Sequence, residues 1–411
     1  MGALSQIPAP WLDVTRTLTR LGRRAPTGID RVELEYLKAF LNAGCDRFLC
    51  RTTRGYLLLD DVGGRLVVDL AEERRALGQA DLLSRLTFRA KRSRHKAEAA
   101  LRAVAIDRCR PGALPALLAR AAPDGWTYLN VGHSNLSEAT LSAFAAGGQS
   151  MVMIHDLIPI THPDLVADDQ PANFAGRVER VRRYTSHVIA NSHATAEALD
   201  LHWHGADRRP ETIVAHLGVP VVEQMAGTRD PLHFVMLGTI EPRKNHALIV
   251  DAWEALAQEL PPEDMPQLHI IGHTGWKVEA LMQRLHSHPL RGQSIHLHGP
   301  LSDEDVHTHL SKATALLFPS ITEGFGFPPL EAAMVGATPI CSDLPVFRET
   351  LGDCVVYVNN PTAYQWKETI KQLIDGKIAR PDLSKVKCPT WQEHFEIVAD
   401  AVITTDPSDR T

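Results

Sequence analysis

The stretch "ALLFPSITEGFGFPPLEAAMVGATPICSD", residues 315–343, contains a complete strand–loop–helix–strand unit. Residues 315–320 and 338–343 are short apolar runs of the kind that forms buried parallel strands, and residues 329–336 predict a helix between them. Prolines at 328 and 329 suit a helix start, where a missing N–H costs no hydrogen bond. This unit therefore predicts a parallel β-sheet covered by helices.

The same alternation extends through the C-terminal half of the chain. Strands are expected at 232–238, 267–272 and 294–299, and helices at 246–260, 277–286 and 302–313. Strict alternation of strands and helices is typical of a doubly wound α/β sheet. In such sheets ligands bind at the carboxyl ends of the strands, so the loops that follow the strands are the place to look for chemistry.

The N-terminal half predicts a second unit of related character. Apolar runs at 128–132, 150–159 and 187–192 are expected to be buried strands, and residues 28–44 a helix that ends at Gly44. Residues 56–60 and 65–70 are expected to pair as two strands across "DVGG". A chain of 411 residues suits two domains, and the Gly- and Pro-containing segment 218–231 is the expected linker.

Composition excludes several classes of protein. A hydrophobic content of 44% with 22% charged residues is that of a folded globular chain, and no run of eighteen apolar residues predicts a membrane span. The N-terminus lacks the basic and apolar pattern of a secretory signal, and six cysteines without CxxC spacing indicate reduced thiols rather than a zinc site or disulfides. We therefore expect a cytoplasmic protein.

Residues 85–110 form a basic segment with nine Lys or Arg against two acidic residues. Cations interleaved with Leu, Phe and Ala can lie on an anionic membrane surface, which would make the protein peripheral at the inner membrane face. The alternative is a solvated helix face or loop. Sparse aromatic residues and the net charge of −6 disfavour nucleic acid as a partner.

Arg243 and Lys244 follow the strand that ends at Gly238 and immediately precede a predicted helix, which Asn245 is expected to cap. Free N–H groups and the positive dipole end at a helix start, together with two cations, form an anion site suited to a diphosphate. The alternative is a solvated Arg–Lys pair on a surface turn.

Glu323 and Glu331 flank the loop "GFGFPP". Glycines allow close approach of the backbone to a ligand, and one carboxylate can accept two hydrogen bonds from vicinal hydroxyl groups. Because they lie eight positions apart, these carboxylates are expected to hold two ends of one ligand rather than to share a proton. The alternative for Glu331, expected in the first turn of the helix, is interaction with the helix dipole.

Three segments together, "GTIEPRKN" at 238–245, "HLHGPLSDEDV" at 296–306 and residues 319–343, resemble the retaining glycosyltransferases of the GT-B fold, family 4 group. The spacing of Glu323 and Glu331 resembles the E-x7-E signature of that family. "TWQEHF" at 390–395 resembles its C-terminal helix, which crosses back to the N-terminal domain.

The resemblance implies two Rossmann-like doubly wound parallel-sheet domains that face each other across a cleft. Residues 1–222 would bind the acceptor, residues 229–385 would bind the nucleotide sugar, and residues 386–411 would cross back to the first domain.

The resemblance also implies roles for individual residues. Glu331 would hold the ribose and Glu323 the transferred sugar, while Arg243 and Lys244 would neutralise the departing diphosphate. The residues expected around the donor are Gly28, Gly238, Thr239, Phe325, Gly326, Phe327 and Glu331. Many relatives carry Arg at the position of Thr239, so either Arg243 supplies the guanidinium group here or the phosphate is held more weakly than in those relatives.

Three polar residues of the N-terminal half are further candidates. "IHDLIPITHP" at 154–163 resembles a segment of bacterial relatives in which His155 would point at the donor sugar, followed by Asp156. The alternative for His155 is a buried histidine at a strand end. Asp156 and His133 are candidates on the acceptor side.

The expected activity is transfer of a hexose, with mannose as the first candidate, from a GDP- or UDP-linked donor to a saccharide or lipid-linked saccharide in bacterial polysaccharide synthesis. The resemblance implies retention at the anomeric carbon, with neither a metal ion nor a cofactor beyond the donor. The alternatives are a sugar-nucleotide 2-epimerase of the same fold and a non-catalytic sugar-nucleotide-binding protein. A dehydrogenase is disfavoured, because no GxGxxG follows a predicted strand.

Overall fold

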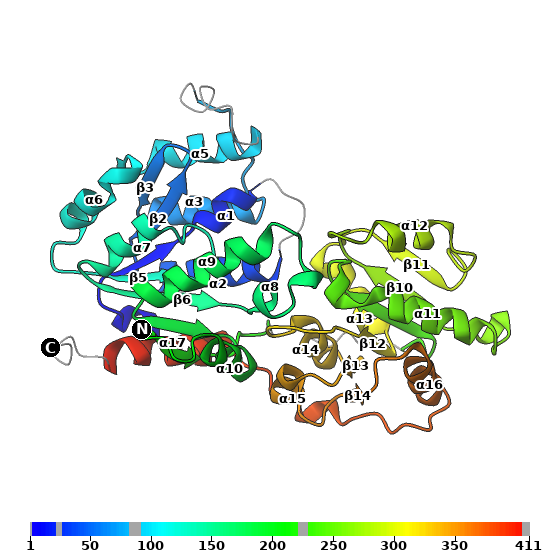
Figure 1. Cartoon of the computed structure of the whole chain (residues 1–411). Coiled ribbons are helices and arrows are strands. Elements are labelled where there is room, and N and C mark those ends of the chain that lie inside the picture. Colours follow the sequence, from blue (N-terminus) through cyan, green and yellow to red (C-terminus); the bar gives the residue numbers. More distant parts are fainter. Residues whose placement is uncertain (1, 22–26, 82–91, 221–228, 405–411) are drawn as a thin grey trace.

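The computed structural model describes residues 2–21, 27–81, 92–220 and 229–404. Two α/β lobes lie side by side, the first built on an eight-stranded sheet and the second on a six-stranded sheet (Figure 1). Most of the expected linker and part of the basic segment 85–110 lie outside the described residues. Among the described residues, no helix has both the length and the apolar character needed to cross a membrane.

The N-terminal sheet has the strand order β4-β3-β2-β1-β5-β6-β7-β8. Its strands are β1 (Pro10–Asp13), β2 (Phe48–Thr52), β3 (Gly55–Leu59), β4 (Asp107–Cys109), β5 (Thr127–Asn130), β6 (Gln149–Ile154), β7 (His187–Ala190) and β8 (Glu211–Val214). The helices of this lobe are α1 (Thr15–Arg20), α2 (Gly28–Asn42), α3 (Asp61–Ala71), α5 (Arg92–Val104), α6 (Leu114–Ala121), α7 (Glu138–Ala145), α8 (Ile158–Thr161), α9 (Gln170–Tyr184) and α10 (His193–His202). Neighbouring strands pair in parallel except β3, which is antiparallel to β2 and to β4, because a short turn after β2 reverses the chain.

The expected strand at 65–70 is wrong, because these residues belong to α3. Asp60 caps this helix by accepting a 3.0 Å hydrogen bond from the backbone N–H of Gly63. The glycines that suggested a hairpin turn serve packing instead: a Cβ at Gly63 or Gly64 would lie only 2.7 or 2.8 Å from side chains of β3 and β2. Their absence of a side chain lets α3 lie close against the sheet.

The C-terminal sheet has the order β11-β10-β9-β12-β13-β14, with every pair parallel. Its strands are β9 (His233–Leu237), β10 (Gln267–Ile271), β11 (Ile295–His298), β12 (Ala315–Phe318), β13 (Thr338–Ser342) and β14 (Val356–Val358). Its helices are α11 (His246–Ala257), α12 (Glu279–Ser287), α13 (Asp303–Lys312), α14 (Phe327–Met334), α15 (Pro345–Leu351) and α16 (Ala363–Ile374). This is the strand order of a dinucleotide-binding Rossmann sheet.

The last helix, α17 (Trp391–Thr404), leaves the second lobe and packs on the first (Figure 1). His394 of α17 lies 2.6 Å from the hydroxyl oxygen of Tyr36 and 3.0 Å from the carbonyl oxygen of His216. The rings of Trp391 and Phe395 pack around the same tyrosine. The C-terminal helix therefore ties the end of the chain to α2.

Candidate active site

The carboxyl ends of β9 and β12 lie next to each other in the middle of the second sheet. The chain proceeds from β9 to β10 on one side and from β12 to β13 on the other, so the strand order reverses at this point. Ligands of α/β sheets bind in the crevice outside such a reversal. A 2.8 Å backbone hydrogen bond from Ile321 to the carbonyl oxygen of Arg243 joins the two loops that leave these strands.

A cluster of buried charges occupies this position. Arg243 Nη1 lies 2.5 Å from Glu323 Oε2, and Lys244 Nζ lies 2.6 Å from Glu323 Oε1. Arg243 Nε is also 2.5 Å from Glu241 Oε1. The side chains of Glu241, Glu323 and Lys244 are 2%, 7% and 9% exposed. The structure thus brings three predicted site residues together and adds Glu241, which sequence reasoning missed although it lies in the same "GTIEPRKN" segment.

The three groups control one another's ionisation. Burial opposes the charged form of Glu323, but Arg243 and Lys244 hold its pKa down at about 2. Burial lowers the pKa of Lys244, and the charge of Glu323 opposes this shift. Two adjacent cations in a buried site can bind an anionic group, and a carboxylate can accept hydrogen bonds from hydroxyl groups.

The N-terminal lobe contacts the second lobe beside this cluster. Asp156 comes from the N-terminal lobe, and Gly324 comes from the loop after β12. Asp156 follows β6, where burial raises its pKa and the charge of Arg243 opposes the shift. A Cβ at Gly324 would lie 2.0 Å from the carbonyl oxygen of His155. Ser192 Oγ donates a 2.8 Å hydrogen bond to the carbonyl oxygen of Gly324. In this structure, therefore, a glycine at 324 lets the loop touch the other lobe, a contact that sequence reasoning did not foresee.

His155 and His133 lie together inside the N-terminal lobe. His155 Nε2 is 2.7 Å from the carbonyl oxygen of Val131, and burial lowers the pKa of His155 to about 4. His133 Nε2 accepts a 3.3 Å hydrogen bond from the backbone N–H of His155. The His155 ring is thus a neutral donor to its own lobe in this structure.

Glu331 of α14 forms an ion pair with α2 of the N-terminal lobe. Its Oε1 accepts a 2.9 Å hydrogen bond from Arg31 Nη1, and Arg31 Nη2 donates at 2.8 Å to Asp303. The Glu331 side chain is 17% exposed; burial raises its pKa, and the positive charge of Arg31 opposes this shift. The expectation of a first-turn position is wrong, because the two prolines fall inside α14, which begins at Phe327. Sequence reasoning also missed Arg31, whose only signal was its place one turn beyond Gly28.

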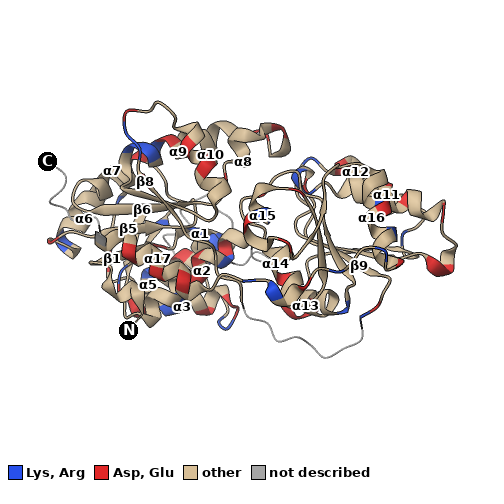
Figure 2. Cartoon of the chain, turned by 90° about the horizontal axis from the view of Figure 1, so that it is seen from below, with Lys and Arg blue, Asp and Glu red and all other residues tan. Residues whose placement is uncertain are grey.

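The junction of the lobes carries charged residues from α2, α13 and α14 (Figure 2). The aromatic loop lies beside them. Phe325 is 4% exposed, and its ring centroid is 5.2 Å from that of Phe327. Gly326 has φ +90°, and a Cβ there would lie 2.5 Å from the ring of Phe347, so only glycine fits. A Cβ placed on Gly28, the first residue of α2, would lie 3.7 Å from the Phe327 ring.

Gly238 and Thr239 begin the loop after β9. Gly238 has φ +137°, and its Cβ position lies 3.5 Å from Lys244 Cε, while Thr239 lies beside Gly275. The capping role expected for Asn245 is wrong: its side chain makes no capping hydrogen bond. Asn245 instead has φ +53°, a left-handed conformation that turns the chain from the short helix Pro242–Lys244 into α11.

Comparison with protein families gives one match, to the family described as glycosyl transferases group 1, over residues 215–386. The serotype-specific mannosyltransferase WbdA of Escherichia coli is 26% identical over 275 residues, which cover 62% of this chain and 33% of WbdA. The O-antigen chain mannosyltransferase RfbU of Salmonella typhimurium is 26% identical over 246 residues, covering 57% of this chain and 66% of RfbU. The matched region therefore spans about a third of WbdA.

Two solved structures share the arrangement of both lobes. Anabaena HepE in complex with UDP superposes with a TM-score of 0.58 at 16% identity, covering 97% of each chain. The apo form of the lipopolysaccharide outer core galactosyltransferase WaaB gives 0.58 at 16% identity, covering 96% of this chain and 99% of WaaB. At this identity the likeness shows the fold alone. The chain therefore has the GT-B fold and carries, over residues 215–386, a domain of the glycosyl transferases group 1 family.

Proposed function

We propose that this protein transfers a hexose from a nucleoside diphosphate sugar to a saccharide acceptor with retention at the anomeric carbon. The observation that carries the proposal is the buried cluster of Arg243, Lys244 and Glu323 where the strand order reverses, with Asp156 facing it from the other lobe. The group 1 domain and the mannosyltransferases among its relatives support a sugar transferase of polysaccharide synthesis, with mannose as the first candidate.

Arg243 and Lys244 would act on the leaving group. Negative charge grows on the departing diphosphate as its bond to the sugar breaks, and fixed cations in a buried site stabilise that charge without reorganisation. The acceptor hydroxyl oxygen would form the new bond on the same face of the anomeric carbon, and its proton would pass to an oxygen of the departing phosphate. The two side chains would do the work of a metal ion, so none is part of the proposal.

Glu331 would hold the nucleotide through its second carboxylate oxygen. Its Oε1 is bonded to Arg31, and Oε2 can accept from a ribose hydroxyl group. This arrangement would tie ribose binding to contact between the lobes, because Arg31 belongs to α2 of the N-terminal lobe.

A lipid-linked acceptor at an anionic membrane is the second part of the proposal. Within α5, Ala97 and Leu101 are fully buried in the N-terminal lobe, so that apolar face does not face outward. Arg94 and Arg102 pair with the buried Glu98 at 3.0 and 3.4 Å. The attraction to a membrane would therefore be electrostatic rather than apolar.

An assay with a panel of nucleoside diphosphate sugars tests the activity. We expect transfer to a saccharide acceptor from one donor, unchanged by EDTA, with a product whose anomeric configuration by NMR equals that of the donor. Conversion of the donor to its 2-epimer without acceptor would instead identify an epimerase. Saturable donor binding with neither transfer nor hydrolysis would identify a binding protein.

A further inference from the structure

Five histidines gather on one face of the C-terminal sheet, under α13. They are His233 of β9, His269 of β10, His296 and His298 of β11, and His309 of α13. The ring centroids of His233 and His269 are 4.0 Å apart, and those of His269 and His296 are 4.7 Å apart. His233 is the first residue of β9, so the cluster lies toward the opposite end of that strand from the candidate active site.

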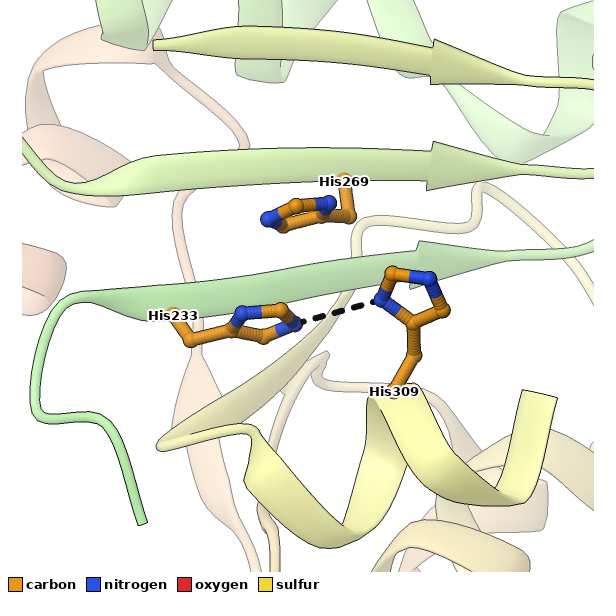
Figure 3. A group of neighbouring side chains, drawn as sticks. All are labelled: His233, His269 and His309. Carbon is orange, nitrogen blue, oxygen red and sulfur yellow. Dashed lines mark hydrogen bonds between the residues drawn. The ribbon is translucent and has the colours of Figure 1, made fainter. Parts of the chain in front are cut away.

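Three of these histidines converge at metal-binding spacing. One ring nitrogen from each of His233, His269 and His309 lies within 4.8 Å of the other two. His309 Nδ1 and His233 Nε2 are 3.5 Å apart (Figure 3). Two nitrogens bound to one tetrahedral ion at about 2.0–2.1 Å lie about 3.3–3.4 Å from each other. The separation of this pair is close to that value, and a ring nitrogen of His269 lies within 4.8 Å of both.

The surroundings suit an imidazole-bound cation. His233 is 8% exposed, and its ring stacks on that of His269; neutral imidazole is the form of histidine that binds metals. His269 Nδ1 lies 3.0 Å from His298 Nε2, a contact of the kind that orients a metal-binding ring. His269 and His309 are partly exposed, so an ion can reach them from solvent.

Charged side chains around the cluster act in both directions. Asp230 favours positive charge near His233, and Asp305 does so near His309. Lys312 opposes positive charge at both histidines. The three imidazoles therefore provide the main attraction, and a neutral histidine set selects Zn²⁺, Ni²⁺, Cu²⁺ or Co²⁺ over Mg²⁺ or Ca²⁺, which prefer oxygen ligands.

We propose that His233, His269 and His309 bind one transition metal ion of the Zn²⁺ class, with water as a fourth ligand. The ion would join two adjacent strands to α13 and so stabilise the C-terminal lobe. The site is separate from the sugar-transfer chemistry and does not rest on it. His298 would hold the His269 ring in place.

Titration of the full chain with ZnCl₂ tests the site, using protein without a polyhistidine tag and stripped of metal. Calorimetry should give one Zn²⁺ per chain, and Zn²⁺ should raise the Tm. His269→Gln and His309→Gln should each weaken Zn²⁺ binding at least about tenfold, since each removes one of three protein ligands. The matched control is His286→Gln, whose exposed ring bonds only to its own helix α12 among the described contacts.

The parent protein provides a second measurement that needs no variant. Its Co²⁺ complex should show the intense visible absorption of four-coordinate cobalt, and Zn²⁺ should displace it. Absence of that absorption, lack of saturable Zn²⁺ binding, or Zn²⁺ affinity that survives in both variants would each overturn the proposal.

Discussion

Glu323 is the residue at which the sequence and the structure can be compared most closely. Its spacing from Glu331 could be read from the chain, and so could the two cations of the preceding loop. Their contact with one another could not, because Arg243 and Glu323 are 80 positions apart and meet only when β9 and β12 pair. The ion pairs also keep Glu323 ionised despite burial, a consequence that no local pattern contains.

Removing the charge of Lys244 should slow turnover far more than it weakens nucleoside binding. Lys244→Met keeps an unbranched apolar side chain but deletes the ammonium group, which lies 4.2 Å from the centre of the Phe318 ring and is the proposed donor to the departing diphosphate. The value of kcat should therefore fall about 10²- to 10³-fold. Steady-state kinetics with the preferred donor provide the measurement. Lys367→Met, which removes a buried cation paired with Glu259 elsewhere in the lobe, is the control and should retain the parental kcat. An unchanged kcat in Lys244→Met would remove its phosphate role.

Glu331→Gln separates a ribose contact from a purely structural ion pair. If the carboxylate holds ribose, nucleoside diphosphate affinity should fall by about 1.5–3 kcal/mol, and the preference for ribose over 2′-deoxyribose should disappear. Calorimetric titration with both nucleotides measures this difference. Arg31→Ala breaks the same ion pair from the other side and should leave the ribose preference intact. A Glu331→Gln protein that still favours ribose as strongly as the parent would contradict the proposed contact.

At the scale of elements, alternation of apolar strands and amphipathic helices was enough to predict five of the six strands of the C-terminal sheet, all of which pair in parallel. The short edge strand β14 was not predicted. The N-terminal lobe was harder, and α3 shows why. A pair of glycines reads as a turn in sequence, but its packing against β2 and β3 depends on a surface built from distant residues. Glycine serves both the close packing of a helix on a sheet and the reversal of the chain, so a pair of glycines in a sequence does not separate the two.

Acidification should loosen the attachment of α17. Burial lowers the pKa of His394 to about 4 from an ordinary value of 6.5, so the folded state resists protonation that the unfolded chain accepts. The contribution of neutral His394 to the free energy of unfolding is therefore fully present above pH 6.5 and is lost as pH falls toward 4. When the pH is lowered from about 7.5 to about 5, this histidine alone should reduce the free energy of unfolding by about 2 kcal/mol.

Urea unfolding of the parent and of His394→Gln at both pH values measures this effect. Tyr36 and the backbone carbonyl of His216 face the ring, and the charge of the His216 side chain further lowers the pKa of His394. Because His216 is present in both proteins, the variant should lose less stability on acidification than the parent. His286→Gln serves as the exposed control. Equal pH dependence in His394→Gln and the parent would contradict the assignment.

Vesicle sedimentation tests the basic segment around α5. Binding to anionic vesicles should exceed binding to neutral vesicles and should weaken steeply as salt is raised, because screening acts over about 8 Å at physiological ionic strength. Since Ala97 and Leu101 are buried, high salt should release the protein completely. Equal binding to both kinds of vesicle would remove the membrane proposal.

At the scale of the whole molecule, the candidate site is a product of contact between two lobes. Three interactions cross that junction: the hydrogen bonds Arg31–Glu331 and Ser192–Gly324, and the charge interaction of Asp156 with Arg243. The resemblance predicted a cleft, but the partners across it depend on how the lobes approach, which no segment of one lobe encodes. The junction is therefore where substitution should affect activity without unfolding either lobe.

Gly324→Ala is the most selective test of this contact. The new Cβ would lie 2.0 Å from the carbonyl oxygen of His155, a backbone atom that cannot move aside without shifting β6. The lobes should stay apart, so transfer activity should fall at least about tenfold, which corresponds to about 1.4 kcal/mol. Small-angle scattering should show a larger radius of gyration, while circular dichroism stays parental. Gly299→Ala, with nothing within 4 Å of its Cβ position, adds the same methyl group in open space and should behave like the parent. A fully active Gly324→Ala protein would mean that this close contact is dispensable for catalysis and that the chemistry proceeds with the lobes held farther apart.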